Sequence, residues 1–491
     1  MIPAFHAASA LCLLGFLLVP CPALATTETD EAETVDELAQ SEEQIVVIGV
    51  RQSYRGDFAI SEIPQSIDVI DAVTLEENNL IRLNDALDLN ASVARQNTLG
   101  GLWDSFAVRG FAGDENIPTG YLVNGFNGGR GFGGERDTAG IERIEVLKGP
   151  AAALLGRGEP GGTVNLVTKQ ARIGDTFGTF GAQFGSFDRI RSEADVNLAI
   201  TDGLSARLIG YVENGDTFRD TVEEYRWGFL PSIGLAIGPD TRITYDLEKT
   251  RVEVPFDRGI VVLDGDFDTV PRNRYLGEPG DGDHIARAEG HSLRVQHDFN
   301  DRWNVLLGGS IRDTLLTGSS SDPELAVSRQ PIFRDGRSLS RQRRSRVYDS
   351  RQVVVRGEVS GTFMTGPLRH RILIGADHDE FDNLQDFRRV RPPSVSSNPS
   401  EQAAYIIDIL DPVYGRFPLP VPLPQNNRLD KQKSTGFFVQ DQIELTNRLQ
   451  VRFGARYDDF SLRTENYLTG VDSERKDDRI SPQFGVVYEI A

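Results

Sequence analysis

Two groups of closely spaced glycines could hold a phosphate group. They are Gly156, Gly158, Gly161 and Gly129, Gly131, Gly134. Both fit the glycine spacing of a dinucleotide-binding loop, but such a loop must open a helix whose N-terminus holds the pyrophosphate. The β-prone run 163–168 follows the first group, and the second group lies in a loop. We therefore expect no nucleotide site, and we interpret these glycines as tight turns with positive φ.

Side chains that commonly perform catalysis or bind metals are few and scattered. The histidines after residue 25 are His284, His291, His297, His370 and His378. No two of them have a zinc-binding spacing, and the sequence contains no Gly-x-Ser-x-Gly nucleophile elbow. The run Asp377–Glu380 holds three acids and one histidine, but we expect it where a strand leaves a sheet. The sequence thus predicts neither an enzyme nor a bound cofactor or metal.

The N-terminus predicts export. Residues 1–25 are typical of a signal peptide, with an apolar core and small residues, Ala23 and Ala25, at the cleavage site. No Lys or Arg precedes the core, and a buried helix is the alternative interpretation. Both cysteines, Cys12 and Cys21, lie in this leader, so we expect no disulfide in the mature chain.

Charge and hydropathy exclude two classes of protein. The 491 residues include 52 Lys and Arg but 73 Asp and Glu, for a formal charge of −21, which argues against a nucleic-acid partner. Eight of the acids lie in residues 26–44 without any basic residue, which predicts a disordered acidic tail. Beyond the N-terminus no run of 18 apolar residues exists, so no membrane-spanning helix is expected.

From about residue 171 onward, apolar and polar side chains alternate. In residues 449–458 the apolar members are Leu449, Val451, Phe453, Ala455 and Tyr457, with a polar residue or glycine after each. The same period of two recurs at 194–200, 204–212, 241–248 and 353–363. We count about twelve such strands, the last at 480–490. Tilted strands of about 9 to 11 residues can cross a bilayer.

Short and long connections alternate between these strands. Tight turns are expected at 201–203, 238–240, 300–302, 364–367 and 446–448. Longer connections are expected at about 213–225, 249–288, 317–346, 384–432 and 464–478. Short turns on one side and long loops on the other are typical of an outer-membrane β-barrel. A soluble secreted β-rich adhesin or sandwich is the alternative.

Six phrases precede the alternating region in a fixed order. They are residues 63–67, 83–87, 108–111, 121–125, 141–150 and 156–169, reading IPQSI, LNDAL, VRGF, YLVNG, IERIEVLKGP and GRGEPGGTVNLVTK. Together they closely resemble the plug of a TonB-dependent siderophore receptor. In the alternating region, residues 440–443 and 454–458 also resemble this family.

The resemblance implies a membrane all-β fold with two parts. An N-terminal α+β plug domain, residues 51–170, would lie in the lumen of an outer-membrane antiparallel β-barrel, residues 171–491. Barrels of this family have 22 strands, of which about 12 would be present here, so we expect about ten more beyond residue 491. A lumen of that width would leak without a plug.

The same resemblance implies a segment that couples the receptor to an energy source. Residues 45–50 resemble the family's TonB box, and its core is Ile45, Val46, Val47, Ile48 and Gly49. Such a segment binds by adding a strand to a sheet edge of TonB, which belongs to an inner-membrane complex driven by protons. The alternative is the first strand of the plug. The tail at 26–44 is too short for an additional signalling domain.

The resemblance also implies the residues that touch the ligand. At the plug apex we predict Arg109, Phe111 and Tyr121, with Trp103 behind them, because Arg pairs with anionic chelates and aromatic rings supply apolar contact. Arg109 as a structural turn residue and Phe111 as plug core remain open alternatives.

Charged residues of the plug are expected to contact the barrel wall. They are Glu142, Arg143, Glu145 and Lys148. A solvated face is the alternative. A second set, expected in a long loop, could attract an anionic chelate or lipopolysaccharide phosphates, or could be merely solvated. It comprises Arg341, Arg343, Arg344 and Arg346.

These expectations converge on a monomeric receptor in the cell outer membrane that contacts lipid and lipopolysaccharide. Its transported ligand would be a ferric siderophore, with import energised by TonB and the proton-motive force. The same architecture could instead carry cobalamin, a glycan or another metal chelate.

Overall fold

The computed structural model describes residues 62–98, 100–112, 118–149, 156, 160–263, 265–396 and 399–490, the last range without the side chains of 399 and 400. All of them belong to one compact unit, Arg51–Ala491. The predicted signal peptide, acidic tail and TonB box lie outside the described residues. Within the described ranges, no helix combines the length and apolar character needed to cross a membrane.

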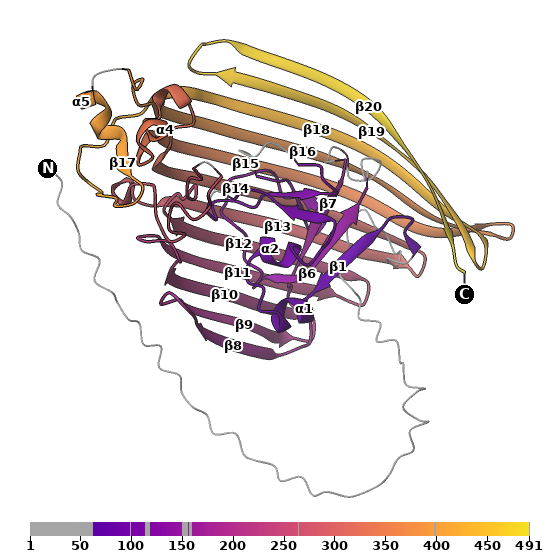
Figure 1. The fold of residues 1–491 in the computed structure, drawn as a ribbon. Coiled ribbons are helices and arrows are strands. Elements are labelled where there is room, and N and C mark those ends of the chain that lie inside the picture. The colour runs from indigo at the N-terminus through magenta and orange to yellow at the C-terminus, as the bar shows by residue number, and fades with distance from the viewer. Residues whose placement is uncertain are drawn as a thin grey trace, which may run out of the picture. The chain divides into compact units, whose positions relative to one another are not determined.

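The first part of the unit is a small α+β domain built on a five-stranded sheet (Figure 1). Its elements are β1 (Ile67–Asp71), α1 (Ala72–Glu77), α2 (Leu83–Leu87), β2 (Val93–Arg95), β3 (Phe106–Val108), β4 (Leu122–Val123), β5 (Phe126–Asn127), β6 (Ile141–Lys148) and β7 (Gly162–Thr168). The strand order is β1-β6-β7-β4-β5, and β2 pairs with β3 separately. Leu83, Ile144 and Leu166 are fully buried in its apolar core, as in a soluble domain.

The second part is one large antiparallel sheet. Its twelve sequential strands are β8 (Phe177–Phe184), β9 (Ile190–Thr201), β10 (Leu204–Asp216), β11 (Glu223–Ile237), β12 (Thr241–Val254), β13 (His284–Asn300), β14 (Trp303–Pro323), β15 (Ser338–Thr365), β16 (Leu368–Val390), β18 (Leu423–Thr446), β19 (Leu449–Asn466) and β20 (Asp472–Tyr488). Each pairs with its neighbour in sequence, so the order is a simple meander. The predicted number of strands and all five predicted tight turns are confirmed.

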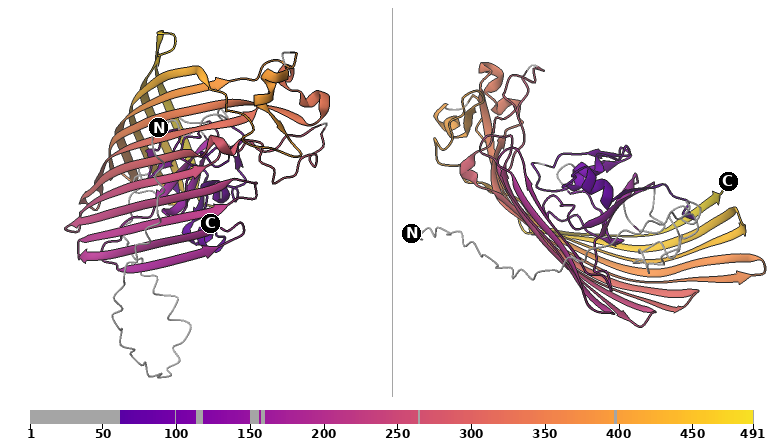
Figure 2. Two further views of the ribbon diagram at one scale, coloured as in Figure 1. Left: turned by 90° about the vertical axis from the view of Figure 1, so that its left-hand side faces the viewer. Right: turned by 90° about the horizontal axis from the view of Figure 1, so that it is seen from below.

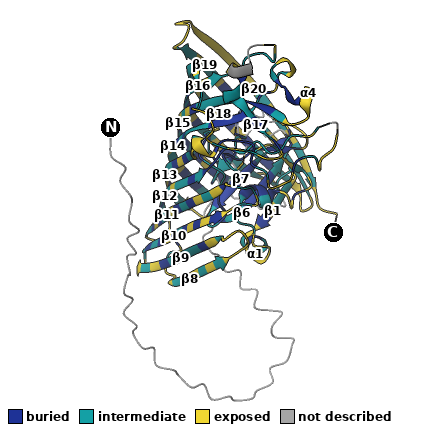
Figure 3. Cartoon of the chain, turned by 60° about the vertical axis from the view of Figure 1, so that its left-hand side comes forward, coloured by how far each residue is buried: buried dark blue, intermediate teal, exposed yellow. Residues whose placement is uncertain are grey.

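The sheet is curved, and the small domain lies against its concave face (Figure 2). Buried and exposed residues alternate along its strands (Figure 3). On β19, Arg452 and Arg456 point inward and are 2% exposed, whereas Phe453 points outward and is 50% exposed. This is the reverse of a soluble protein, and it suits a wall with lipid outside and a polar interior.

The strands are longer than the sequence pattern predicted. The expected loops at 213–225 and 464–478 were wrong, because only residues 217–222 and 467–471 separate the strands there. The extra strand residues are polar on both faces. An apolar outer face is needed only where a strand lies in the bilayer. Strand ends outside the bilayer therefore show no alternation of apolar and polar residues in the sequence. Charged side chains pair across these ends, as Arg463 of β19 does with Asp472 of β20, 3.0 Å apart.

Three long connections, 255–283, 324–337 and 391–422, pack together at one end of the strands and form what we call the loop cap. It contains η2 (Pro279–Asp281), η3 (Val327–Arg329), α4 (Ile332–Asp335), α5 (Pro399–Gln402), η4 (Ala403–Tyr405) and β17 (Ile406–Asp408), and β17 pairs with the start of β15. Its own apolar core includes Val270, Leu276, Ile332 and Ile407, with Leu339 of β15. The cap is therefore a folded layer.

Candidate functional site

Buried ion pairs hold the small domain against the sheet. Asp137 accepts two hydrogen bonds from Arg191 on β9, at 2.8 and 2.9 Å. Arg82 lies 2.5 Å from Glu213 on β10. A buried charge is tolerated only when it is paired. At these positions the small domain and the sheet thus present opposite charges to each other.

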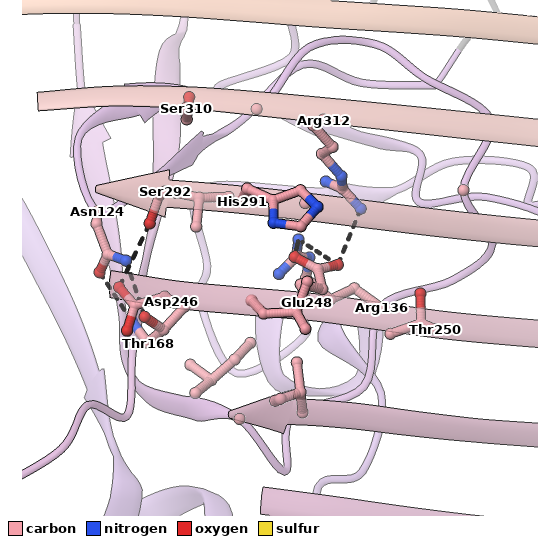
Figure 4. A pocket seen from close by; sticks show the side chains of 18 of the residues that line it. Asn124, Arg136, Thr168, Asp246, Glu248, Thr250, His291, Ser292, Ser310 and Arg312 are labelled. Atoms are coloured by element: carbon pink, nitrogen blue, oxygen red, sulfur yellow. Dashed lines mark hydrogen bonds and ion pairs between the residues drawn. The ribbon is translucent and has the colours of Figure 1, made fainter. Parts of the chain in front are cut away.

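A second group of charges surrounds Arg136 (Figure 4). Arg136 and Arg312 of β14 both donate to the carboxylate of Glu248 on β12, at 2.7 and 3.1 Å. Both guanidinium groups also donate to the hydroxyl of Tyr121, at 3.2 and 2.9 Å. Burial lowers the pKa of Arg136, but Glu248 and Tyr121 more than reverse this, so its pKa lies above the ordinary value. Arg136 therefore stays charged.

A cavity of about 100 Å³ lies beside this group, between the small domain and the sheet. Asn124 and Thr168 line it from the small domain, and Asp246 and Ser292 line it from the sheet (Figure 4). Elsewhere apolar side chains close the same interface, where Trp103 and Phe132 of the small domain pack against residues of the sheet such as Leu316. The interface therefore combines buried charge pairs with apolar packing.

Asp104 is buried near the same charges and has an unusual acidity. Burial and the neighbouring Glu135 raise its pKa to about 7, although Arg136 opposes the shift. Its carboxylate accepts from the backbone nitrogen of Arg136, at 3.2 Å, and from the Asn84 side chain. This group can gain or lose a proton near neutral pH.

A separate contact ties the start of the described chain to the sheet. The carboxylate of Glu62 accepts two hydrogen bonds of 2.7 Å from Arg371 on β16. Arg371 also donates to Glu444 on β18, at 2.7 Å, and Gln442 donates to the Glu62 carbonyl oxygen, at 3.0 Å. We call this contact the Glu62 clasp. It lies near the tight-turn end of the strands, opposite the loop cap.

The four predicted ligand residues lie in three different surroundings. Trp103 is buried under the loop cap, with its ring 5.3 Å from that of Phe132. Tyr121 is buried in the Arg136 group. Arg109 and Phe111 are exposed on a turn after β3, where Arg109 has a φ of +52°.

The glycine-rich phrase packs against that turn. A Cβ atom on Gly161 would lie 1.9 Å from the carbonyl oxygen of Val108, so only glycine fits. Gly156, Gly129 and Gly134 have positive φ, as the sequence predicted, whereas Gly131 and Gly161 do not, so the prediction was wrong for these two. Gly131 lies so close to β14 that a Cβ atom would meet Thr314 at 2.3 Å. These glycines allow close packing of the small domain.

The four charged residues predicted to contact the barrel pair locally. Arg143 donates to Glu145, at 2.8 Å, and Lys148 lies 2.5 Å from Asp68. Glu142 lies 3.5 Å from Arg172, which leads into β8. Their contact with a barrel wall stays a prediction. Sequence reasoning missed Arg82, Arg136 and Asp137, although inward-facing charges such as Arg191 could have been inferred from strand alternation.

The arginines expected in a long loop lie on β15, so that expectation was wrong. Arg341 lies 3.0 Å from Glu278 and Arg343 lies 2.7 Å from Asp281, both acids of the loop cap. Asp377–Glu380 lies within β16 and not at its end. No cluster of three or more potential metal ligands occurs among the residues that the structure describes.

Comparison with known proteins agrees with this architecture. Residues 59–163 match the TonB-dependent receptor plug domain, and residues 225–491 match the family described as TonB dependent receptor-like, beta-barrel. The chain therefore belongs to the TonB-dependent receptor family. Proteins of this family are outer-membrane receptors and not enzymes, so the predicted fold and location are confirmed.

Two characterised relatives illustrate the similarity. The metal-pseudopaline receptor CntO of Pseudomonas aeruginosa is 33% identical over 89% of this chain and 60% of its own length. The ferrichrome outer membrane transporter/phage receptor of Escherichia coli is 25% identical over 90% of this chain and 61% of its own. The chain thus spans about three fifths of the length of these relatives.

Solved structures share the fold. The crystal structure of the siderophore receptor PiuA from Acinetobacter baumannii superposes with a TM-score of 0.79 at 20% identity, covering 89% of this chain and 64% of that one. The closed form of the ferric-catecholate import receptor Fiu from E. coli gives 0.77 at 19% identity, covering 89% and 65%.

Proposed function

We propose that this protein imports a metal–siderophore chelate across the outer membrane, energised by TonB and the proton-motive force. The observation that carries the proposal is the plug, which is fastened inside the curved sheet by buried charge pairs such as Asp137–Arg191. Ion pairs at an interface can separate and re-form, because each charged group recovers its hydration when the pair parts. The relatives named for metal or iron chelates support the choice of cargo.

The energy-coupling step is proposed for the segment Ile45, Val46, Val47, Ile48 and Gly49. An extended segment can add a strand to a sheet edge of TonB, so backbone hydrogen bonds supply the affinity. A pull on this segment would travel along the chain and reach the Glu62 clasp first among the described contacts. Opening of the clasp would then precede any movement of the plug.

The ligand is proposed to enter from the loop-cap side. There Trp103 lies beneath the cap, and Tyr121 links the plug to β12 and β14 through Arg136 and Arg312. We propose that Trp103 and Tyr121 respond to the bound chelate from the plug side of the ligand site. The exposed Arg109 and Phe111 are proposed to contact it directly.

The metal in the chelate is a second question. A ferric siderophore is the first candidate, and a chelate of another metal is the second, because one relative is named for metal–pseudopaline. Cobalamin and glycans are less favoured by these names. Growth on metal-limited medium, with single chelates added in turn, separates these cargoes.

The experiment that tests the proposal is removal of residues 45–49 from the receptor. We expect uptake of a radiolabelled metal chelate to cease, while chelate binding to whole cells persists. Removal of residues 36–40 from the predicted acidic tail serves as a length-matched control and should leave uptake intact. Unchanged uptake after removal of 45–49 would contradict the proposal.

A further inference from the structure

Four arginines gather on the concave face of the sheet, close to the loop cap. They are Arg344 and Arg346 on β15, Arg389 on β16 and Arg428 on β18, and we call them the arginine patch. Arg344 pairs directly with Arg389 across the two strands. Gln385 pairs with Arg428 across the next two strands. The four side chains therefore lie on one face of three adjacent strands.

Strand alternation places the arginine patch on the inner side of the wall. Arg346 shares its face of β15 with the buried residues Ser350 and Gln352, which lie four and six residues further along the strand. Arg389 shares its face with the buried Asn383 and Gln385. The preceding residue, Arg388, points the other way, with its side chain 50% exposed and paired with Asp386.

Aromatic rings lie among these guanidinium groups. The charges of Arg344 and Arg346 each lie 5.8 Å from the ring centre of Phe387, and Arg346 lies 4.3 Å from that of Phe256. Tyr348, two residues beyond Arg346, contacts Phe132 of the plug, at 4.7 Å between ring centres. The patch thus borders the plug residues that lie under the cap.

The positive charge of the patch is only partly balanced. Asp322 lies 3.2 Å from Arg344 and 3.6 Å from Arg346, so one carboxylate faces two arginines. Arg428 lies 3.1 Å from Asp430. Arg389 donates to the neutral side chain of Gln425, at 3.4 Å, and its buried Nε has no hydrogen-bond partner among the described residues.

Their neighbours on β15 provide the contrast. Arg341 and Arg343 each have their own acid, Glu278 and Asp281, so this stretch is neutral. Arg344 shares Asp322 with Arg346 and also interacts electrostatically with Arg389 and with Arg258 of the loop cap. One carboxylate does not neutralise this many like charges, which repel unless a further anion lies among them.

We propose that the arginine patch binds the carboxylate groups of an anionic metal chelate, which makes this receptor selective for carboxylate-bearing siderophores. The inference rests on the proposed function and names the chemical class of its cargo. Guanidinium groups match carboxylates with two parallel hydrogen bonds, and flanking aromatic rings add apolar contact. Lipopolysaccharide phosphates do not fit, because they would lie on the outer side of the wall.

The test measures chelate binding by the full chain in detergent micelles with isothermal titration calorimetry. Ferric citrate and cobalt(III)–EDTA serve as carboxylate probes, and a ferric trihydroxamate without carboxylates serves as the comparison. The variants are Arg389→Gln and Arg428→Gln, with Arg388→Gln as the matched control on the outer side. Arg389→Lys keeps the charge but loses the planar fork.

We expect the unaltered chain to bind a carboxylate probe, and each glutamine variant to bind it about tenfold more weakly. Arg389→Lys should fall between them, Arg388→Gln should match the unaltered chain, and added salt should weaken binding. Equal binding by all variants, or binding of the trihydroxamate alone, would overturn the patch proposal and leave chelate import standing. Failure to bind any of the three chelates would overturn both.

Discussion

The plug and the sheet bury opposite kinds of side chain. The plug hides leucine, isoleucine and valine, such as Leu83 and Ile144, whereas the largest fully buried side chains of the sheet are arginines, such as Arg191 and Arg226. Each part follows its own surroundings: the plug has an aqueous exterior, and the sheet has lipid outside and polar groups inside. The chain therefore buries apolar side chains in the plug and charged side chains on the inner face of the sheet. The two parts meet at an interface that contains buried charge pairs.

The sharpest way to break this comparison is to remove a charge where the two parts meet. Arg191→Met leaves Asp137 buried without its bidentate partner. We expect the free energy of unfolding of the plug to fall by about 3–5 kcal/mol. Hydrogen exchange of the plug amides in the full chain measures it.

Two further variants serve as controls for that change. Arg475→Met alters an arginine of β20 whose side chain is exposed, and it should have no effect. Adding Asp137→Asn to Arg191→Met should restore part of the loss, because no unpaired carboxylate remains. No recovery in the double variant would argue that Arg191 acts through packing.

The apolar core of the plug predicts the next largest loss of stability. Ile144→Ala opens a cavity in the fully buried core of the five-stranded sheet. The plug should lose about 2–5 kcal/mol of stability, again measured by hydrogen exchange. Val73→Ala, at an exposed position of α1, should leave it unchanged. Equal effects of both substitutions would mean that the plug is not packed as described.

The apolar outer face of the sheet predicts a smaller loss of stability. Phe453→Arg places a charge where lipid is expected, at a position 50% exposed on β19. We expect a cost of about 2–4 kcal/mol near the middle of the bilayer, measured by urea unfolding of the chain in lipid vesicles. Tyr467→Arg, in the connection between β19 and β20, should cost little.

Proton binding by Asp104 offers a test within the plug. Its pKa is raised to about 7 in the fold, so between its ordinary value near 4 and pH 7 the folded state binds more protons than the unfolded state. The contribution of Asp104 to plug stability should therefore be largest at low pH and fall by up to about 4 kcal/mol as pH rises through this window. Asp104→Asn should flatten the profile, and Asp85→Asn, exposed on α2, should not.

The Glu62 clasp should give the smallest change in stability. Glu62→Gln keeps the shape but removes the charge that Arg371 holds. A loss of about 1 kcal/mol is expected because the pair is partly exposed. Single-molecule pulling from the N-terminus should show the plug releasing at lower force, with Glu76→Gln, on the exposed face of α1, as the control. Unchanged release force would remove the clasp from the proposed pulling path.

The strand pattern could be predicted from the sequence because lipid acts on each strand locally. Arg452 is buried on the polar inner face and the adjacent Phe453 is exposed on the outer face, so two neighbouring residues already show the alternation. The strand ends could not be predicted, since the stretches 213–216 and 464–466 carry no apolar side chain on either face of their strands. The same lack of signal placed Arg344 and Arg346 in a loop, although they lie on β15.

The candidate site was less predictable than the fold. Arg109 and Phe111 were found in a family phrase, but nothing near Trp103 in the sequence indicates its burial beneath the cap. The contacts of Arg82 with Glu213 and of Glu62 with Arg371 join residues 131 and 309 positions apart. No local pattern identifies such partners.

By itself, then, the sequence determined the alternation of twelve strands, their tight turns, the order of plug phrases and the family. Only the tertiary structure decided which charges meet, and that four arginines from three strands lie on one face of the sheet. The physical reason is range: bilayer and turn preferences act over a few residues, whereas charge pairing depends on distances that the folded chain alone creates.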